Sequence, residues 1–118
     1  MALTRDGEVY TWGYGKSGRL GHGDEEDQML PKRVESLRGE KINTICAGYD
    51  VSAAISMAGK VWVWGYGFFW QLGQDDNKDR LVPTALGALL QHFVCLPACL
   101  RLSRSRPSVC VCDMWAVA

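Results

Sequence analysis

The chain has 118 residues, of which 47% are apolar and 22% are charged, and its formal net charge at pH 7 is zero. This composition is ordinary for a globular protein. A neutral chain lacks the positive surface with which proteins bind nucleic acid or anionic membranes. The sequence therefore predicts another protein as the partner, and no nucleic acid.

No part of the sequence predicts export or a membrane span. Residues 1–7 lack the basic start and apolar core of a secretory signal. The most apolar stretch, residues 85–100, is interrupted by Gln91, His92 and Pro97, and it falls short of the ~18 apolar residues that a span needs. We expect an intracellular protein, cytoplasmic or nuclear.

The first predicted strand, residues 9–12 (VYTW), is nearly the same as residues 61–64 (VWVW), which are apolar on both alternating faces. It runs into a glycine-rich series of turns, residues 13–23. An acidic loop follows, and Pro31 then fits the start of an outer edge strand, where a missing N–H costs least. Residues 42–47, 51–56 and 61–64 are next, and they predict three short strands joined by tight turns.

One signature occurs twice at a fixed offset of 52 residues (59 − 7 and 83 − 31). Its positions are Gly7, Trp12, Gly13, Leu20, Gly21 and Pro31 in the first copy and Gly59, Trp64, Gly65, Leu72, Gly73 and Pro83 in the second. Four strands in ~50 residues, covered on both faces, are typical of a propeller blade. Over residues 1–87 we therefore predict an all-β fold, a partial β-propeller built of four-stranded antiparallel blades. Trp12 and Trp64 are expected in its core.

Residues 88–118 differ from the rest of the chain. They contain no glycine, and they hold four of the five cysteines, namely Cys95, Cys99, Cys110 and Cys112. The cysteine spacing does not match that of zinc knuckles. We expect a divergent, non-propeller tail that is poorly ordered.

Residues 7–13 (GEVYTWG), residues 18–24 (GRLGHGD) and Pro31 closely resemble the repeat of the regulator of chromosome condensation family. The resemblance covers roughly residues 2–87. It implies a seven-bladed β-propeller, which serves as a guanine-nucleotide exchange factor in the founding member and as a binding module in others, including HECT-type ubiquitin ligases. Because the chain opens in the middle of a unit, we expect a fragment with about two repeats.

Two motifs that resemble chemical sites are better explained as turns. Residues 13–18 follow the pattern Gly-x-Gly-x-x-Gly, but a dinucleotide site also needs a helix there, and residues 19–23 continue as turns. Residues 75–79 have carboxylates at the spacing of a calcium loop, but Arg80 stands where that loop needs glycine. No serine or cysteine has a paired base at a recognisable spacing. We predict no catalytic, cofactor or metal site.

Acidic loops recur at the same place in each unit, so in a propeller they are expected near one another on one rim. Their residues are Asp24, Glu25, Glu26, Asp27, Asp75 and Asp76. Two interpretations stay open, namely a binding surface for a basic partner and solvated loops that keep the edges soluble.

The absence of a convincing polar constellation favours a protein-interaction or scaffold module with no chemistry of its own. One alternative is a fragment of a guanine-nucleotide exchange factor, with a small GTPase as partner. Another is the substrate-binding propeller of a ubiquitin ligase, with a partner from the ubiquitin pathway.

Overall fold

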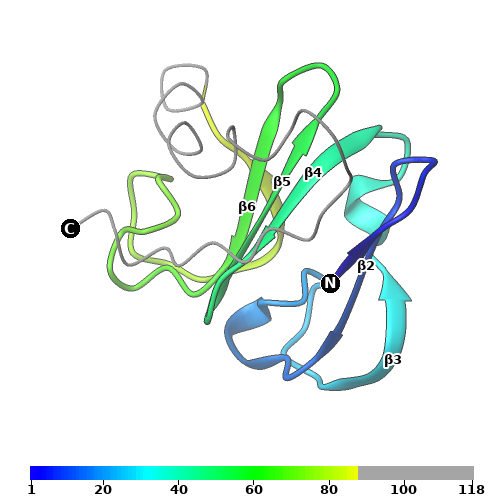
Figure 1. The fold of residues 1–118 in the computed structure, drawn as a ribbon. Coiled ribbons are helices and arrows are strands. Elements are labelled where there is room, and N and C mark those ends of the chain that lie inside the picture. Colours follow the sequence, from blue (N-terminus) through cyan, green and yellow to red (C-terminus); the bar gives the residue numbers. More distant parts are fainter. Residues whose placement is uncertain (88–118) are drawn as a thin grey trace.

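The computed structural model describes residues 1–87, which form two antiparallel sheets (Figure 1). The sheets have the orders β1-β2-β3 and β4-β5-β6-β7, so that strands consecutive in the chain are neighbours in space. The strands are β1 Ala2–Leu3, β2 Val9–Gly13, β3 Gln28–Arg33, β4 Ile42–Ala47, β5 Val51–Ser56, β6 Val61–Gly65 and β7 Arg80–Ala85. The all-β fold with antiparallel blades is confirmed. The predicted tail, residues 88–118, lies outside the described residues.

The two sheets repeat the same pairing at the offset that the sequence shows. Thr11 pairs with Lys32 in the first sheet, and Val63 pairs with Thr84 in the second. In both, the register shifts between that pair and the next one, and the extra residues fall in β3 and β7, opposite Trp12 and Trp64. The repeat in the sequence is therefore a repeat of backbone geometry.

The prolines of the outer strands lie further inside them than predicted. β3 begins at Gln28 and contains Pro31, and β7 begins at Arg80 and contains Pro83. The outermost position of both strands is as expected, but the expectation that Pro31 begins its strand is wrong. A proline is tolerated inside an edge strand where the pairing is irregular, because no ladder hydrogen bond is lost there.

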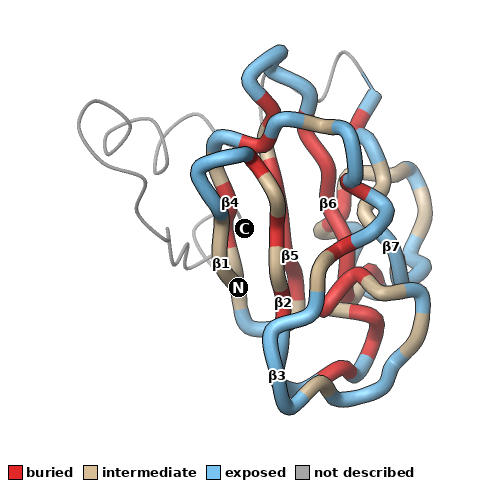
Figure 2. The backbone as a smooth tube through the Cα atoms, turned by 90° about the vertical axis from the view of Figure 1, so that its right-hand side faces the viewer, coloured by how far each residue is buried: buried red, intermediate tan, exposed pale blue. Residues whose placement is uncertain are grey.

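The hydrophobic core lies between the two sheets. It combines Val9, Val34 and Leu37 with Ile42, Ile45, Ala54, Trp62 and Trp64. On its other face the second sheet has a second cluster, formed by Cys46, Val51, Ala53, Val61, Val63, Leu72 and Leu86. Strand β6 is consequently buried on both faces along its whole length, as the sequence predicts (Figure 2).

Strand β2 does not share this burial. Trp64 is fully buried, whereas Trp12 is 39% exposed, although both occupy the same place in the repeat. Val9 and Thr11 point toward the second sheet and are buried, while Tyr10 and Trp12 point to the other side. The prediction that Trp12 belongs to the core is therefore wrong, because no described blade covers that face.

Two short 3-10 helices complete the fold, η1 Lys16–Gly18 in the connection from β2 to β3 and η2 Glu35–Leu37 in the connection from β3 to β4. The glycines that end the tryptophan strands, Gly13 and Gly65, have φ values of 105° and 109°. Only glycine adopts such angles without strain. The glycine-rich signature is thus used for turn geometry.

Candidate functional site

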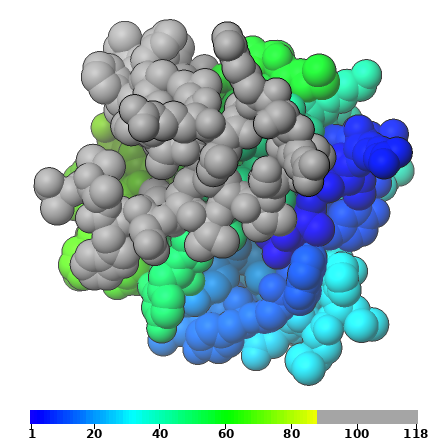
Figure 3. All heavy atoms as spheres, viewed as in Figure 1, coloured from blue at the N-terminus to red at the C-terminus, as the bar shows by residue number. Residues whose placement is uncertain are grey.

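Both acidic connections lie at the same end of the molecule (Figure 1). We call residues 14–27 the first loop and residues 66–79 the second loop. The turn at residues 48–50 lies between them: the Tyr66 N–H donates to the Asp50 carbonyl (2.9 Å), and Arg19 Nη1 donates to the Tyr49 carbonyl (3.0 Å). Together these three segments form a continuous surface, which we call the loop face. Figure 3 shows the first unit, in blue and cyan, in direct contact with the second unit, in green.

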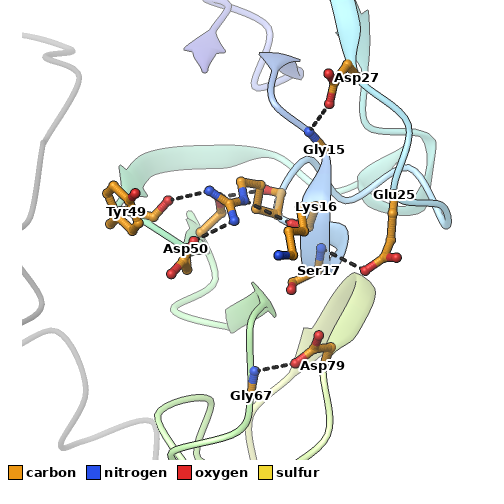
Figure 4. A network of polar contacts seen from close by, with 11 residues as sticks. Gly15, Lys16, Ser17, Glu25, Asp27, Tyr49, Asp50, Gly67 and Asp79 are labelled. Atoms are coloured by element: carbon orange, nitrogen blue, oxygen red, sulfur yellow. Dashed lines mark hydrogen bonds and ion pairs between the residues drawn. The ribbon is translucent and has the colours of Figure 1, made fainter.

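Each loop is closed by the same hydrogen bond. Asp27 Oδ1 accepts the Gly15 N–H at 2.8 Å, and Asp79 Oδ1 accepts the Gly67 N–H at 2.8 Å (Figure 4). A Cβ atom on Gly15 would lie 2.1 Å from the Glu26 carbonyl oxygen, and one on Gly67 would lie 1.9 Å from the Lys78 carbonyl oxygen. In each loop this hydrogen bond joins the beginning of the loop to its end. The glycine has no side chain, so the two ends of the loop can lie in direct contact.

Most of the predicted rim carboxylates take part in holding the loops. Glu25 Oε1 accepts the Ser17 N–H at 2.8 Å, and Asp24 Oδ1 accepts the Glu26 N–H at 3.1 Å. Asp27, as described above, closes the first loop.

The second loop is similar, because Asp76 Oδ1 accepts the Lys78 N–H (3.2 Å) and Asp76 Oδ2 binds Arg80 Nη2 (2.8 Å). The hydrogen bond from Arg80 is the main reason why the pKa of Asp76 is lowered. Among the six rim residues, only Glu26 and Asp75 have side chains without a polar contact inside residues 1–87. A role of the acidic rim in binding stays a prediction.

An arginine of the first loop connects the two units. The Arg19 guanidinium lies 4.9 Å from the centre of the Tyr14 ring and 5.9 Å from that of Tyr49, and its Nη2 forms an ion pair with Asp50 Oδ1 at 2.5 Å. Arg19 Nε also donates to the Lys16 carbonyl at 2.9 Å. Sequence reasoning missed this cluster, because Arg19 and Asp50 are brought together only when the two sheets pack.

The second loop carries an exposed group of aromatic rings. The Tyr66 ring is stacked with Phe68 (centroids 6.3 Å apart) and meets Phe69 edge-on (6.0 Å), while Phe68 and Phe69 lie 5.3 Å apart. Phe68 and Phe69 are 55% and 73% exposed. We call these three residues the aromatic cluster. The sequence shows an unusually apolar segment here, but no role follows from the pattern alone.

The glycines of the first loop make room for the second unit. Gly21 lies against the indole of Trp64, since a Cβ atom there would be 2.8 Å from Trp64 Nε1. Gly18 lies against Leu81, with its hypothetical Cβ atom 2.5 Å from the Leu81 Cα, and the Gly23 N–H donates to the Leu81 carbonyl at 2.9 Å. These glycine positions are therefore contact points between successive units.

His22, in the first loop, is hydrogen-bonded to Thr11 of strand β2. The Thr11 hydroxyl donates to the Leu20 carbonyl (2.6 Å), and the same oxygen lies 2.8 Å from His22 Nε2. A hydroxyl has a single proton, so Nε2 is the donor to Thr11 and carries the hydrogen. Burial is the largest cause of the lowered pKa of His22, followed by the positive charge of Lys32; the Thr11 contact and Asp24 oppose them.

Nothing in residues 1–87 forms a group of three or more metal-ligating side chains.

A cleft of about 210 Å³ lies at the end opposite the loop face, between the 6–9 hairpin and residues 33–41. Its Arg33 is paired with Glu8 at 2.8 Å and with Glu35 at 3.6 Å. No helix in residues 1–87 is long and apolar enough to cross a membrane.

A three-stranded and a four-stranded sheet that repeat the same pairing of a tryptophan strand with an outer strand define a β-propeller repeat protein. The sequence pattern of the regulator of chromosome condensation (RCC1) repeat matches residues 6–55 and 58–101, and the chain belongs to that family. The second match ends beyond residue 87, the boundary placed by sequence analysis.

Similar proteins include the ultraviolet-B receptor UVR8 of Arabidopsis thaliana, 39% identical over 79% of this chain, and the human E3 ubiquitin-protein ligase HERC2, 40% identical over 84% of it. The chain spans 21% of the length of UVR8 and 2% of the length of HERC2.

Among solved structures, human WBSCR16 superposes with a TM-score of 0.65 at 30% identity, and Prp20p from Saccharomyces cerevisiae with 0.64 at 24% identity. Each match covers 72% of this chain and 22% of the other. The likeness to Prp20p, a protein studied for its binding to Gsp1p and histones, shows the shared fold alone.

Proposed function

We propose that these units act as a protein-interaction module without chemistry of its own, and that the loop face is the surface that contacts a basic partner. The observation that carries the proposal is the recurrence of two acidic loops at one end of the sheets, each closed by the same Gly N–H to Asp bond. A surface held in place before binding loses little conformational entropy when the partner binds.

The charges of the loop face are unbalanced toward the acidic side. The first loop has four carboxylates and two basic side chains, and the second loop has three carboxylates and one lysine. The whole chain is neutral, so this excess is local. A basic partner is attracted to such a surface, and the attraction weakens as salt is added.

The test separates charge from loop structure by using the two carboxylates that hold nothing in place. We would measure the affinity of the full chain for a cationic peptide of alternating arginine and glycine by fluorescence anisotropy, at low and at physiological salt. The double variant E26K/D75K is expected to bind about tenfold more weakly at low salt, since each surface charge contributes ~0.5–1 kcal/mol.

The matched control for each single reversal, E26K or D75K, is D6K, which makes the same change in charge at an exposed residue of the hairpin opposite the loop face. It should leave the affinity unchanged once the small difference in net charge is allowed for. Undiminished binding by E26K/D75K would exclude the acidic loop face as the contact surface.

A second candidate role is the substrate-binding part of a ubiquitin ligase, and the 40% identity to HERC2 supports it. The matching experiment is ubiquitin transfer, in the full-length protein, to a substrate captured by these units. Transfer that is unaffected by E26K/D75K would argue against this role. A part in guanine-nucleotide exchange on a small GTPase, the other alternative, has fold-level support only.

A further inference from the structure

Arg19 of the first unit fills a binding arrangement for a guanidinium that both units build, because Tyr14 comes from the first unit and the turn of residues 48–50 from the second. Arg19 lies over Tyr14 and beside Tyr49, and its charge is paired with Asp50. A cation over aromatic faces with a carboxylate at its edge gains from the ring quadrupoles and from the charge-assisted hydrogen bond. The side chain of Arg19 is only 17% exposed, so the arrangement is closed to other cations.

The second loop keeps one ring of this arrangement, has two further rings at positions 68 and 69, and within residues 1–87 lacks the cation. Tyr66 is the counterpart of Tyr14 and Gln71 the counterpart of Arg19, at the offset of 52 residues. The Gln71 side chain turns back to accept the Phe69 N–H at 2.8 Å. Within residues 1–87, no cation–π contact joins the aromatic cluster to a lysine or an arginine.

The loop around the aromatic cluster retains its shape. The Trp70 N–H donates to the Gly67 carbonyl at 3.0 Å, as the Gly18 N–H does to the Gly15 carbonyl at 3.1 Å. The rings are thus presented on a loop of the same geometry, with an acidic excess in the same loop. This charge disfavours an anionic ligand, and the exposed ring faces favour a cationic one.

We propose that the aromatic cluster of Tyr66, Phe68 and Phe69 binds an arginine or lysine side chain of a basic protein segment, in the place that Arg19 takes in the first unit. Arginine is preferred, because its flat guanidinium stacks on rings and is more weakly hydrated than an ammonium group. The inference rests on the proposed function and adds to it the residue type that the partner contributes and the loop that receives it.

The decisive variant is Q71R, which gives the second loop a cation of its own. Arg19 is steadied by the Lys16 carbonyl, and the matching carbonyl in the second loop is that of Phe68. Q71R is therefore expected to occupy the aromatic cluster from within and to weaken binding of the arginine-glycine peptide about fivefold to tenfold. Q71L is the matched control, because it also removes the hydrogen bond to Phe69 without adding a cation. It should bind like the unchanged chain.

Removal of the rings gives an independent measurement. F69A is expected to weaken peptide binding about fivefold, and a peptide with lysine in place of arginine should bind more weakly than the arginine form. Since Phe69 is exposed, F69A should leave the thermal unfolding midpoint unchanged.

The outcomes distinguish this inference from the function on which it rests. If E26K/D75K weakens binding while Q71R and F69A bind like Q71L and the unchanged chain, the aromatic cluster is not the receiving site and the acidic loop face stands. If no variant changes the affinity, both proposals fail. A loss with Q71R that Q71L does not share supports the inference.

Discussion

Equal residues in the two units have different surroundings, and Trp12 and Trp64 show this most clearly. Both lie in the strand next to the outer one of their sheet, where the pairing is irregular, yet Trp64 is buried beneath Gly21 of the first unit and Trp12 is 39% exposed. The difference arises because the face of Trp64 meets the other sheet, whereas the face of Trp12 meets none in residues 1–87. In a repeat protein, burial is a property of the contact between units rather than of one unit.

The second comparison is between Gly18 and Trp70, which occupy the same place in the two loops. Gly18 has φ 71° and touches the Leu81 backbone of the next unit. Trp70 has φ 63°, in the left-handed region that favours glycine, and its side chain is 61% exposed. The second loop therefore keeps the turn of the first without the close contact that explains the glycine.

The largest expected effect is on the pair of tryptophans. W64A removes a fully buried indole and should lower the free energy of unfolding by about 3–5 kcal/mol. W12A removes a partly exposed one and should cost about 1 kcal/mol. Urea unfolding followed by circular dichroism measures both. Equal losses of stability would mean that Trp12 is as buried in solution as Trp64, and the contrast in burial between the two units would be contradicted.

The next largest effect is expected at the glycine near the beginning of each loop, Gly15 or Gly67, where the two units have the same close contact. G67A places a methyl group against the Lys78 carbonyl oxygen and should cost about 3 kcal/mol, near the upper part of the usual overpacking range. G15A should cost a similar amount, because Glu26 lies equally close. G87A, at a glycine with open space around it, serves as the control in the same urea experiment. A G67A variant as stable as G87A would show that the loop base opens easily.

Substitutions at the equivalent positions 18 and 70 should change the stability in opposite directions in the two units. W70G removes a left-handed tryptophan and is expected to stabilise the chain by about 1 kcal/mol. G18A introduces a Cβ atom 2.5 Å from the Leu81 Cα and should destabilise it by about 2 kcal/mol. Thermal unfolding midpoints give the sign of each change. A lower midpoint for W70G would reveal packing of the Trp70 ring that outweighs the backbone strain.

The smallest effect is a pH dependence that only the first unit has, since Gln74 replaces His22 in the second. The pKa of His22 in the folded chain is below its ordinary value of 6.5. Below that value the unfolded chain binds more protons than the folded one, so stability falls as the pH drops from 6.5 toward the lowered pKa. H22Q should reduce this slope between about pH 5 and 6.5. NMR titration of the imidazole checks the direction, and a pKa above 6.5 would contradict it.

Much of the fold can be predicted from local pattern. The unbroken apolar run of residues 61–64 predicts a strand buried on both faces, and the turn glycines predict where the chain reverses; both agree with the structure. The start of the outer strands is less predictable, because proline signals an edge without indicating how far the pairing extends on either side. Pro31 lies inside β3 for that reason.

The loop face was only partly visible in the sequence. The recurrence of acidic residues locates the two loops, but it does not distinguish Asp27, which closes a loop, from Glu26, which holds nothing in place. Such a distinction depends on which N–H lies within reach of each carboxylate. The Arg19 cluster was not predictable, since its partners Tyr49 and Asp50 are thirty or more residues away in the chain.

Local sequence pattern is enough to establish two copies of one bladed unit, because turn glycines and apolar strand residues act over a few neighbouring positions. Tertiary contacts settle which of two equivalent tryptophans is buried and which carboxylates hold the loops. They also place Arg19 in a site built by both units, while the rings of the second loop stay open. Those outcomes depend on contacts between units, and the residues that make them are far apart in the sequence.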